Sequence, residues 1–203
     1  VILGPNGAGK SSFIKAVAGL VPITSGNVTL EGDEITRVPA HKMIHRGLAF
    51  VPQTENVFPL MSVEDNLRLA VRVLVSRGVP ERIAEMYDLF PDLARQRKLM
   101  AGSLSGGQRQ MLAVARALIV RPKILILDEP SAGLSPKFVG MVFSMLSDVR
   151  ATGVTMVLVE QNAKAALAMG DRAYVLVEGR ERHEGVASEL WKDPVVAALY
   201  LGH

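Results

Sequence analysis

Residues 4–11 form a glycine-rich loop of the kind that binds phosphate. They read Gly-Pro-Asn-Gly-Ala-Gly-Lys-Ser and match the pattern G-x-x-x-x-G-K-[ST]. Glycines let the backbone approach a phosphate chain, and the N–H groups of such a loop, together with the start of the following helix, attract anions. The pattern places Lys10 near the β- and γ-phosphates and the Ser11 hydroxyl on Mg²⁺. The predicted nucleotide contacts are Gly4, Pro5, Asn6, Gly7, Ala8, Gly9, Lys10, Ser11 and Ser12.

An acidic pair follows an apolar stretch in the middle of the chain. Asp128 and Glu129 come directly after the apolar residues 124–127. Ligands of open α/β sheets bind at the C-terminal ends of the strands. Asp128 can therefore hold a metal ion, directly or through water, and Glu129 can act as general base toward an attacking water. Two solvated carboxylates are the alternative, but the phosphate-binding loop favours the catalytic interpretation.

A second glycine-rich segment, Leu-Ser-Gly-Gly-Gln at residues 104–108, precedes a strong helical pattern. It predicts a second helix N-terminus that can attract an anion. The simpler alternative is an N-cap in which Ser105 caps the helix and the glycines supply turn geometry. One nucleotide cannot easily use both glycine-rich sites of one chain, whereas two chains that face each other can use them together. The candidate residues are Ser105, Gly106, Gly107 and Gln108.

Strand-like and helical patterns alternate along the chain, and these elements must position the motifs. The apolar runs at 124–127 and 154–159 are typical of parallel strands covered on both faces. Further strands are expected at 1–3, 28–30, 49–51 and in a hairpin from 174, and helices at 11–20, 107–120, 138–150 and 187–201. The alternation predicts an α/β fold with a mainly parallel sheet flanked by helices.

Residues 60–104 differ from the rest of the chain. They are richer in charge, helical in pattern, and broken at the sequences Gly-Val-Pro (78–80) and Phe-Pro (90–91). We interpret them as a helical subdomain inserted into a single domain that spans residues 1–203.

The composition limits the classes of protein that the chain can belong to. Its 203 residues are 49% hydrophobic and 21% charged, which is ordinary globular usage and excludes disordered and collagen-like chains. The net charge of +3 is too small to argue for a nucleic-acid partner, although the sequence pI of about 9.3 leaves one open. The lack of cysteine excludes disulfides and thiolate metal sites. No apolar run reaches the roughly 18 residues of a membrane helix. Because the sequence opens without methionine inside a strand pattern, we expect an N-terminal segment to be missing.

The three motifs together resemble the ATP-binding cassette (ABC) ATPases, in which they occur in this order and spacing. The resemblance implies a P-loop NTPase core, hydrolysis of ATP with Mg²⁺, and a head-to-tail dimer. In that dimer ATP would lie between residues 4–11 of one chain and residues 105–107 of the other. Gln53 falls at the family's Q-loop position, where it would contact Mg²⁺ or the water and sense a transmembrane partner. The implied metal contacts are Ser11, Gln53 and Asp128.

Further segments resemble the shorter ATPase of branched-chain amino acid importers. These segments are 53–59, 131–136, 159–162 and 198–202. The resemblance implies a motor subunit on the cytoplasmic face of the inner membrane, working with a second ATPase subunit, two permeases and, indirectly, a periplasmic binding protein, without nucleic acid. Urea or amide importers, exporter ATPases, a non-transport ABC ATPase and a regulatory module without turnover are the alternatives.

The sequence departs from the wider family at three places. Gln161 stands where most cassettes have a histidine, and a glutamine cannot become cationic. We expect it to act in catalysis by orienting the γ-phosphate or the water. Ser135 stands where an aspartate is usual, which puts communication across the dimer through that carboxylate in doubt. The adenine-stacking aromatic residue normally lies upstream of Val1.

Overall fold

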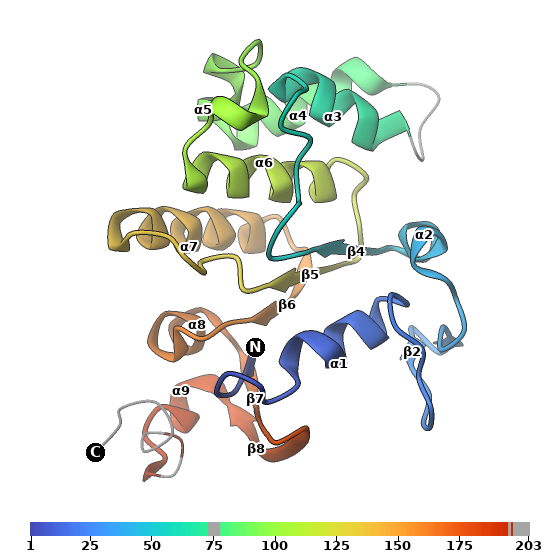
Figure 1. Cartoon of the computed structure of the whole chain (residues 1–203), viewed down its shortest axis with the longest axis vertical. Coiled ribbons are helices and arrows are strands. Elements are labelled where there is room, and N and C mark those ends of the chain that lie inside the picture. The colour runs from blue at the N-terminus through green and yellow to red at the C-terminus, as the bar shows by residue number, and fades with distance from the viewer. Residues whose placement is uncertain (73–77, 195, 197–203) are drawn as a thin grey trace.

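The computed structural model describes residues 1–72, 78–194 and 196 (Figure 1). A six-stranded sheet with the order β4-β5-β6-β1-β7-β8 forms its centre. The first five strands in this order pair in parallel, and β8 pairs antiparallel with β7. The bounds are β1 Ile2–Leu3, β4 Leu48–Val51, β5 Ile124–Asp128, β6 Thr155–Val159, β7 Arg172–Val177 and β8 Arg180–Val186. The predicted α/β fold with a mainly parallel sheet is confirmed.

The alternation of side chains along β5 divides the core into two layers. Leu125 and Leu127 belong to the larger cluster, with apolar residues of α6 (Gly106–Leu118) and α7 (Pro136–Ala151). Ile126 belongs to the smaller cluster, with Ile14 of α1 (Lys10–Val17). Figure 1 shows α6 and α7 stacked on one side of the strands and α1 on the other. Both faces of β5 are therefore covered, as its uninterrupted apolar sequence requires.

The stretch from 60 to 104 contains three helices, α3 (Val63–Arg72), α4 (Val79–Leu89) and α5 (Pro91–Arg95). A 3₁₀ turn, η2 (Ala101–Ser103), leads to α6. Proline stands in the first turn of α4 and of α5, where its missing N–H costs nothing. Asn66 of α3 is fully buried and donates its amide to the Phe58 and Ser62 carbonyls (both 3.0 Å), which ties this stretch to the preceding loop. Its standing as a separate subdomain stays a prediction.

Two expected elements differ from the structure. The strand expected at 28–30 is β2 (Thr29–Leu30), which pairs only with β3 (Asp33–Glu34) in a separate two-stranded hairpin. The helix expected to begin at 187 is α9, which ends at Leu190; much of the rest of that prediction lies outside the described residues. The other short elements are α2 (Ala40–Met43), η1 (Ile44–Arg46) and α8 (Ala163–Met169). Within the described ranges, no helix is both long and apolar enough to span a bilayer.

Candidate active site

The loop predicted to bind phosphate connects β1 to α1, and its glycines have two different roles. Gly7 and Gly9 have φ angles of +79° and +91°, a region that glycine adopts without steric cost. Gly4 instead allows close approach, because a Cβ there would lie 2.3 Å from the Leu176 carbonyl oxygen of β7. Of the other predicted contacts, Ala8 is buried, and Pro5, Asn6 and Ser12 are exposed at the loop and the start of α1.

Lys10 and Ser11, in the first turn of α1, face in toward the protein. Lys10 is 4% exposed, and its Nζ donates to the carbonyl oxygens of Gly4 (2.8 Å) and Pro5 (3.2 Å). The Ser11 Oγ donates to Asp128 Oδ1 over 2.9 Å, although 117 positions separate the two residues in sequence. The loop and the end of β5 therefore form one site.

Glu129 is the point at which the other predicted residues converge. Its Oε2 accepts hydrogen bonds from Gln161 Nε2 (2.7 Å) and Gln53 Nε2 (3.2 Å), and its Oε1 lies 3.6 Å from Lys10 Nζ. The residue has a φ of +47°, an uncommon conformation for a residue with a side chain. Its N–H donates to the Val159 carbonyl of β6 (2.9 Å). The surrounding structure fixes this backbone conformation, which four other residues with side chains in the described ranges share.

The order of the strands explains this convergence. Gln53, Glu129 and Gln161 each follow one of the neighbouring parallel strands β4, β5 and β6. The register pairs Val51 with Leu127 and Asp128 with Val159, so the three strands end at the same edge of the sheet. Side chains 76 and 32 positions from Glu129 in sequence thereby reach one carboxylate.

Asp128 and Ser11 suit a divalent cation that also binds phosphate. Burial raises the pKa of the Asp128 carboxyl, while the hydrogen bond from Ser11 and the positive charge of Lys15 act in the opposite direction. A cation at this carboxylate would offset the cost of burying its charge. Magnesium is usually held by one or two carboxylates together with substrate phosphates. The donor set therefore fits magnesium, and among the described residues no group of three or more histidine or acidic side chains could hold a resident metal by itself.

The second glycine-rich segment forms the N-terminus of α6. Ser105 is the N-cap: its Oγ accepts from the Gln108 N–H (3.3 Å), and the Gln108 side chain accepts from the Ser105 N–H (3.0 Å). A Cβ on Gly106 would lie 2.8 Å from Leu134 Cδ2, and one on Gly107 would lie 2.9 Å from Phe138 Cδ1. The structure thus contains the N-cap of the simpler alternative, whereas the two glycines do not adopt a positive φ. They allow close packing against the chain that follows β5.

Sequence reasoning missed Glu160. This carboxylate is only 1% exposed, and it accepts hydrogen bonds from the backbone N–H groups of Ser131 (2.9 Å) and Gln161 (3.2 Å). The available signal was a charged residue directly after an apolar strand, the same signal that identified Asp128.

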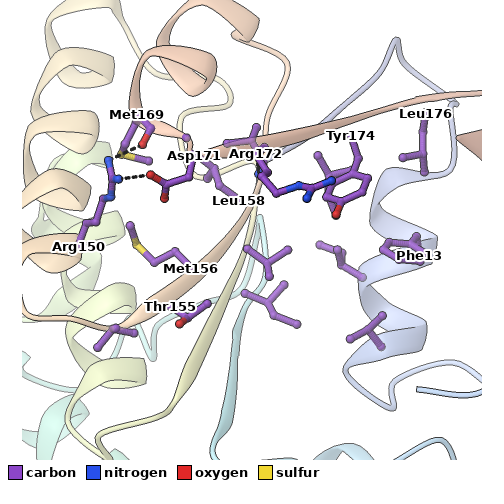
Figure 2. A pocket seen from close by; sticks show the side chains of 18 of the residues that line it. Phe13, Arg150, Thr155, Met156, Leu158, Met169, Asp171, Arg172, Tyr174 and Leu176 are labelled. Atoms are coloured by element: carbon purple, nitrogen blue, oxygen red, sulfur yellow. Dashed lines mark hydrogen bonds and ion pairs between the residues drawn. The ribbon is translucent and has the colours of Figure 1, made fainter. Parts of the chain in front are cut away.

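A cavity of about 790 Å³ lies apart from these residues (Figure 2). It is lined mainly by apolar side chains of α1, β6 and β7, including Phe13, Leu158 and Tyr174. The ion pair between Arg150 and Asp171 is at its wall. None of the residues predicted to bind nucleotide or metal lines this cavity, so its size does not identify the site.

The sequence is similar to known transporter subunits. Residues 1–132 match the family model described as "ABC transporter". A probable branched-chain amino acid transport ATP-binding protein of Archaeoglobus fulgidus is 44% identical, with 99% of this chain and 86% of that protein covered. A high-affinity branched-chain amino acid transport ATP-binding protein of Pseudomonas aeruginosa is 38% identical, again with 99% of this chain and 86% of that protein covered. A lipopolysaccharide export ATP-binding protein of Escherichia coli is 34% identical, with 99% and 84% covered.

Solved structures agree with the sequence comparison. The ADP conformation of an ATP-binding cassette of an ABC transporter matches with a TM-score of 0.84 at 28% identity. The match covers 100% of this chain and 87% of the cassette. A dimeric cassette in a post-hydrolysis state, bound to ADP and phosphate, matches with a TM-score of 0.79 at 26% identity. That match covers 92% of this chain and 84% of the cassette. The fold, the motifs and the similarity over nearly the whole chain lead to one conclusion: the chain belongs to the ATP-binding cassette family of transporter ATPases.

Proposed function

We propose that this ATPase hydrolyses the β–γ bond of ATP by an in-line attack of water, with Glu129 as the general base. The supporting observation is the convergence of Gln53, Gln161 and Lys10 on the Glu129 carboxylate. As the water oxygen bonds to the γ-phosphorus and the bond to the bridging oxygen breaks, Glu129 takes a proton from the water. Lys10 and the loop N–H groups stabilise the charge on the phosphate oxygens.

Gln53 and Gln161 fix the direction of the Glu129 carboxylate in this scheme. Both are neutral amide donors, so they can orient a carboxylate without supplying a proton. A glutamine at position 161 is therefore compatible with turnover, although most of the family carries a histidine there.

Ser11 and Asp128 would hold Mg²⁺, with Gln53 as a further contact. The ion would supply positive charge at the β- and γ-phosphates during transfer. We propose this role for Ser11 and Asp128 because a hydroxyl and a carboxylate oxygen, ligands that Mg²⁺ prefers, lie 2.9 Å apart beside the loop.

Family members work as dimers together with permeases, and we propose the head-to-tail arrangement for this chain. Ser105, Gly106 and Gly107 would then contact the γ-phosphate that is bound by the loop of the second chain. The capping box fixes the N-terminus of α6, which leaves a helix end with its positive dipole available to an anion. Identifying the ATPase subunit that co-purifies with this chain would show whether the second subunit is a copy of it or a relative.

A groove beside Gln53 is our candidate for contact with the permease. It has a volume of about 520 Å³ and is lined by Leu20, Pro52 and Arg116, among others. Leu20 and Phe58, which are 49% and 45% exposed, offer apolar surface near it. The guanidinium group of Arg116 lies 4.6 Å above the Phe58 ring. A permease segment seated in the groove would lie next to the loop that carries Gln53, and the chain would then act at the cytoplasmic face of the membrane.

Import of branched-chain amino acids is the transport reaction that the relatives favour. Two relatives that cover nearly the whole chain, at 44% and 38% identity, carry that description. Lipopolysaccharide export is the second candidate, because a relative at 34% identity carries it. The ATPase would be purified with its membrane partners and reconstituted in liposomes. Stimulation of hydrolysis by a leucine-loaded binding protein supports import, and stimulation by lipopolysaccharide alone would overturn it.

The variant Glu129→Gln tests the catalytic assignment. It keeps the shape of the side chain and removes the base, so we expect hydrolysis to fall about 10²–10⁴-fold while ATP still binds. Phosphate release and ATP affinity should be measured in the complex with the membrane partners. Glu189→Gln, the same change at an exposed position on α9, serves as the matched control. Unchanged turnover in Glu129→Gln would remove Glu129 from the role of base.

A further inference from the structure

Glu160 joins the two loops that carry the catalytic side chains. One oxygen of its carboxylate accepts from the Ser131 N–H (2.9 Å), two residues after Glu129. The other oxygen accepts from the N–H groups of Gln161 (3.2 Å) and Asn162 (3.5 Å). The loop after β5 and the loop after β6 are therefore held by a single side chain.

This carboxylate is buried without a cation. It is 1% exposed, and within the described residues no lysine, arginine or histidine forms an ion pair with it. Burial raises its pKa, while the hydrogen bonds from Ser131, Asn162 and Gln161 act in the opposite direction. Burying a charge is costly unless hydrogen bonds compensate for it. An apolar side chain would avoid this cost, but it could not bind the N–H groups of both loops.

The two catalytic side chains depend on Glu160 to different degrees. The Glu129 backbone is fixed to β6 by its own hydrogen bond to Val159, which does not involve Glu160. Gln161 is an exposed residue at the start of its loop, and the Glu160 carboxylate binds its N–H. Without that bond, the backbone that directs Gln161 Nε2 onto Glu129 loses a restraint.

We propose that Glu160 is a positioning residue that fixes the Gln161 side chain on the Glu129 carboxylate by holding the backbone N–H groups of Ser131 and Gln161. This inference rests on the proposed roles of Glu129 and Gln161 in hydrolysis. It assigns to Glu160 no contact with ATP, so its loss should affect turnover and leave nucleotide affinity nearly unchanged.

A double-mutant cycle tests the inference. Glu160→Gln replaces one acceptor oxygen by an amide NH₂, which would face a backbone N–H. In the complex with the membrane partners, we expect kcat to fall at least about 10-fold, with KM for ATP changed less than about 3-fold. In a Gln161→Ala background the same substitution should lower kcat less than about 2-fold, because the side chain that Glu160 positions is already absent.

Two further variants make the result decisive. Glu160→Asp keeps the buried charge but is shorter by one methylene, so we expect a smaller loss of kcat with the same dependence on Gln161. It also serves if Glu160→Gln fails to fold. Glu189→Gln is the surface control. Full turnover in both Glu160 variants, or equal losses with and without Gln161, would overturn the inference. If Glu129→Gln also retained full turnover, the proposed catalytic function itself would fail.

Discussion

At the scale of single residues, two neutral amide donors and one lysine surround the Glu129 carboxylate. Gln53 and Gln161 approach the same oxygen of Glu129, and neither changes charge with pH. A histidine at position 161 would instead titrate near neutrality. In the proposed mechanism, the two glutamines therefore orient Glu129 through hydrogen-bond geometry rather than through charge, so the position of the Gln161 backbone matters.

Tyr87 allows a test of how burial acts on a single group. Burial, followed by the negative charge of Glu64, raises its pKa to about 12, and its hydroxyl is buried without a partner among the described residues. Above pH 10 an unfolded tyrosine ionises while Tyr87 stays protonated, so the folded state binds more protons than the unfolded state. The free energy of unfolding should therefore fall as the pH rises from about 10 to 12.

The variant Tyr87→Phe isolates this contribution. It removes an unpaired buried hydroxyl, so we expect equal or higher stability at pH 7 and a weaker loss of stability above pH 10. Urea unfolding of both proteins across this pH range provides the measurement. Parallel stability curves for the two proteins would contradict the assignment of the pH dependence to Tyr87.

At the scale of elements, the distance between α6 and α7 depends on glycine. The N-terminus of α6 approaches Leu134 and Phe138 so closely that no Cβ fits at Gly106 or Gly107 without movement. This contact places the capped end of α6 beside the segment that follows Glu129. Within one chain, packing therefore connects the Ser105 end of α6, which is proposed to contact a second chain's nucleotide, with the segment that carries Glu129.

The variant Gly107→Ala tests this contact. Alanine favours a helix over glycine by up to about 1 kcal/mol, but a Cβ 2.9 Å from the Phe138 ring overpacks the interface at a cost of about 1–3 kcal/mol. We therefore expect a net loss of about 1 kcal/mol in urea unfolding, which Phe138→Leu should partly restore. Gly140→Ala in α7 is the matched control, because no atom lies within 4 Å of its Cβ. It should stabilise by about 0.5–1 kcal/mol; the same gain at Gly107 would contradict the packing argument.

At the scale of the whole molecule, the proposed reaction needs two chains. The loop, Asp128 and Glu129 lie together in one chain, and Ser105 makes its capping hydrogen bonds within α6. If the second chain supplies Ser105 to the nucleotide, activity should depend on assembly as well as on the integrity of one site.

The variant Ser105→Arg tests the need for a second chain. Its bulk should block closure of the dimer and lower hydrolysis at least about 100-fold, with ATP affinity of the single chain retained. Ser105→Ala reports the stability of about 1 kcal/mol that is lost with the cap alone. Ser188→Arg, at an exposed position of α9, controls for the added charge. Phosphate release and sedimentation with ATP would be measured together, and a stable dimer of Ser105→Arg with full turnover would contradict the head-to-tail proposal.

The sequence alone predicted the parts of the site that consist of contiguous residues. The loop from Gly4 to Ser11, the pair Asp128 and Glu129, and the cap at Ser105 are local patterns, because short-range backbone geometry requires these residue types. The apolar runs also predicted β5 and β6, since a parallel strand covered on both faces must be apolar throughout.

Only the tertiary structure decided how these parts meet. No local sequence pattern indicates that β4, β5 and β6 are neighbours. Yet this strand order brings the Gln53 and Gln161 side chains within hydrogen-bond distance of the Glu129 carboxylate. The role of Gly107 likewise depends on Phe138 in another helix, and the proposed role of Glu160 depends on the N–H of Ser131, which follows a different strand. Such contacts join residues far apart in the chain, and strand order and register determine them rather than the preferences of neighbouring residues.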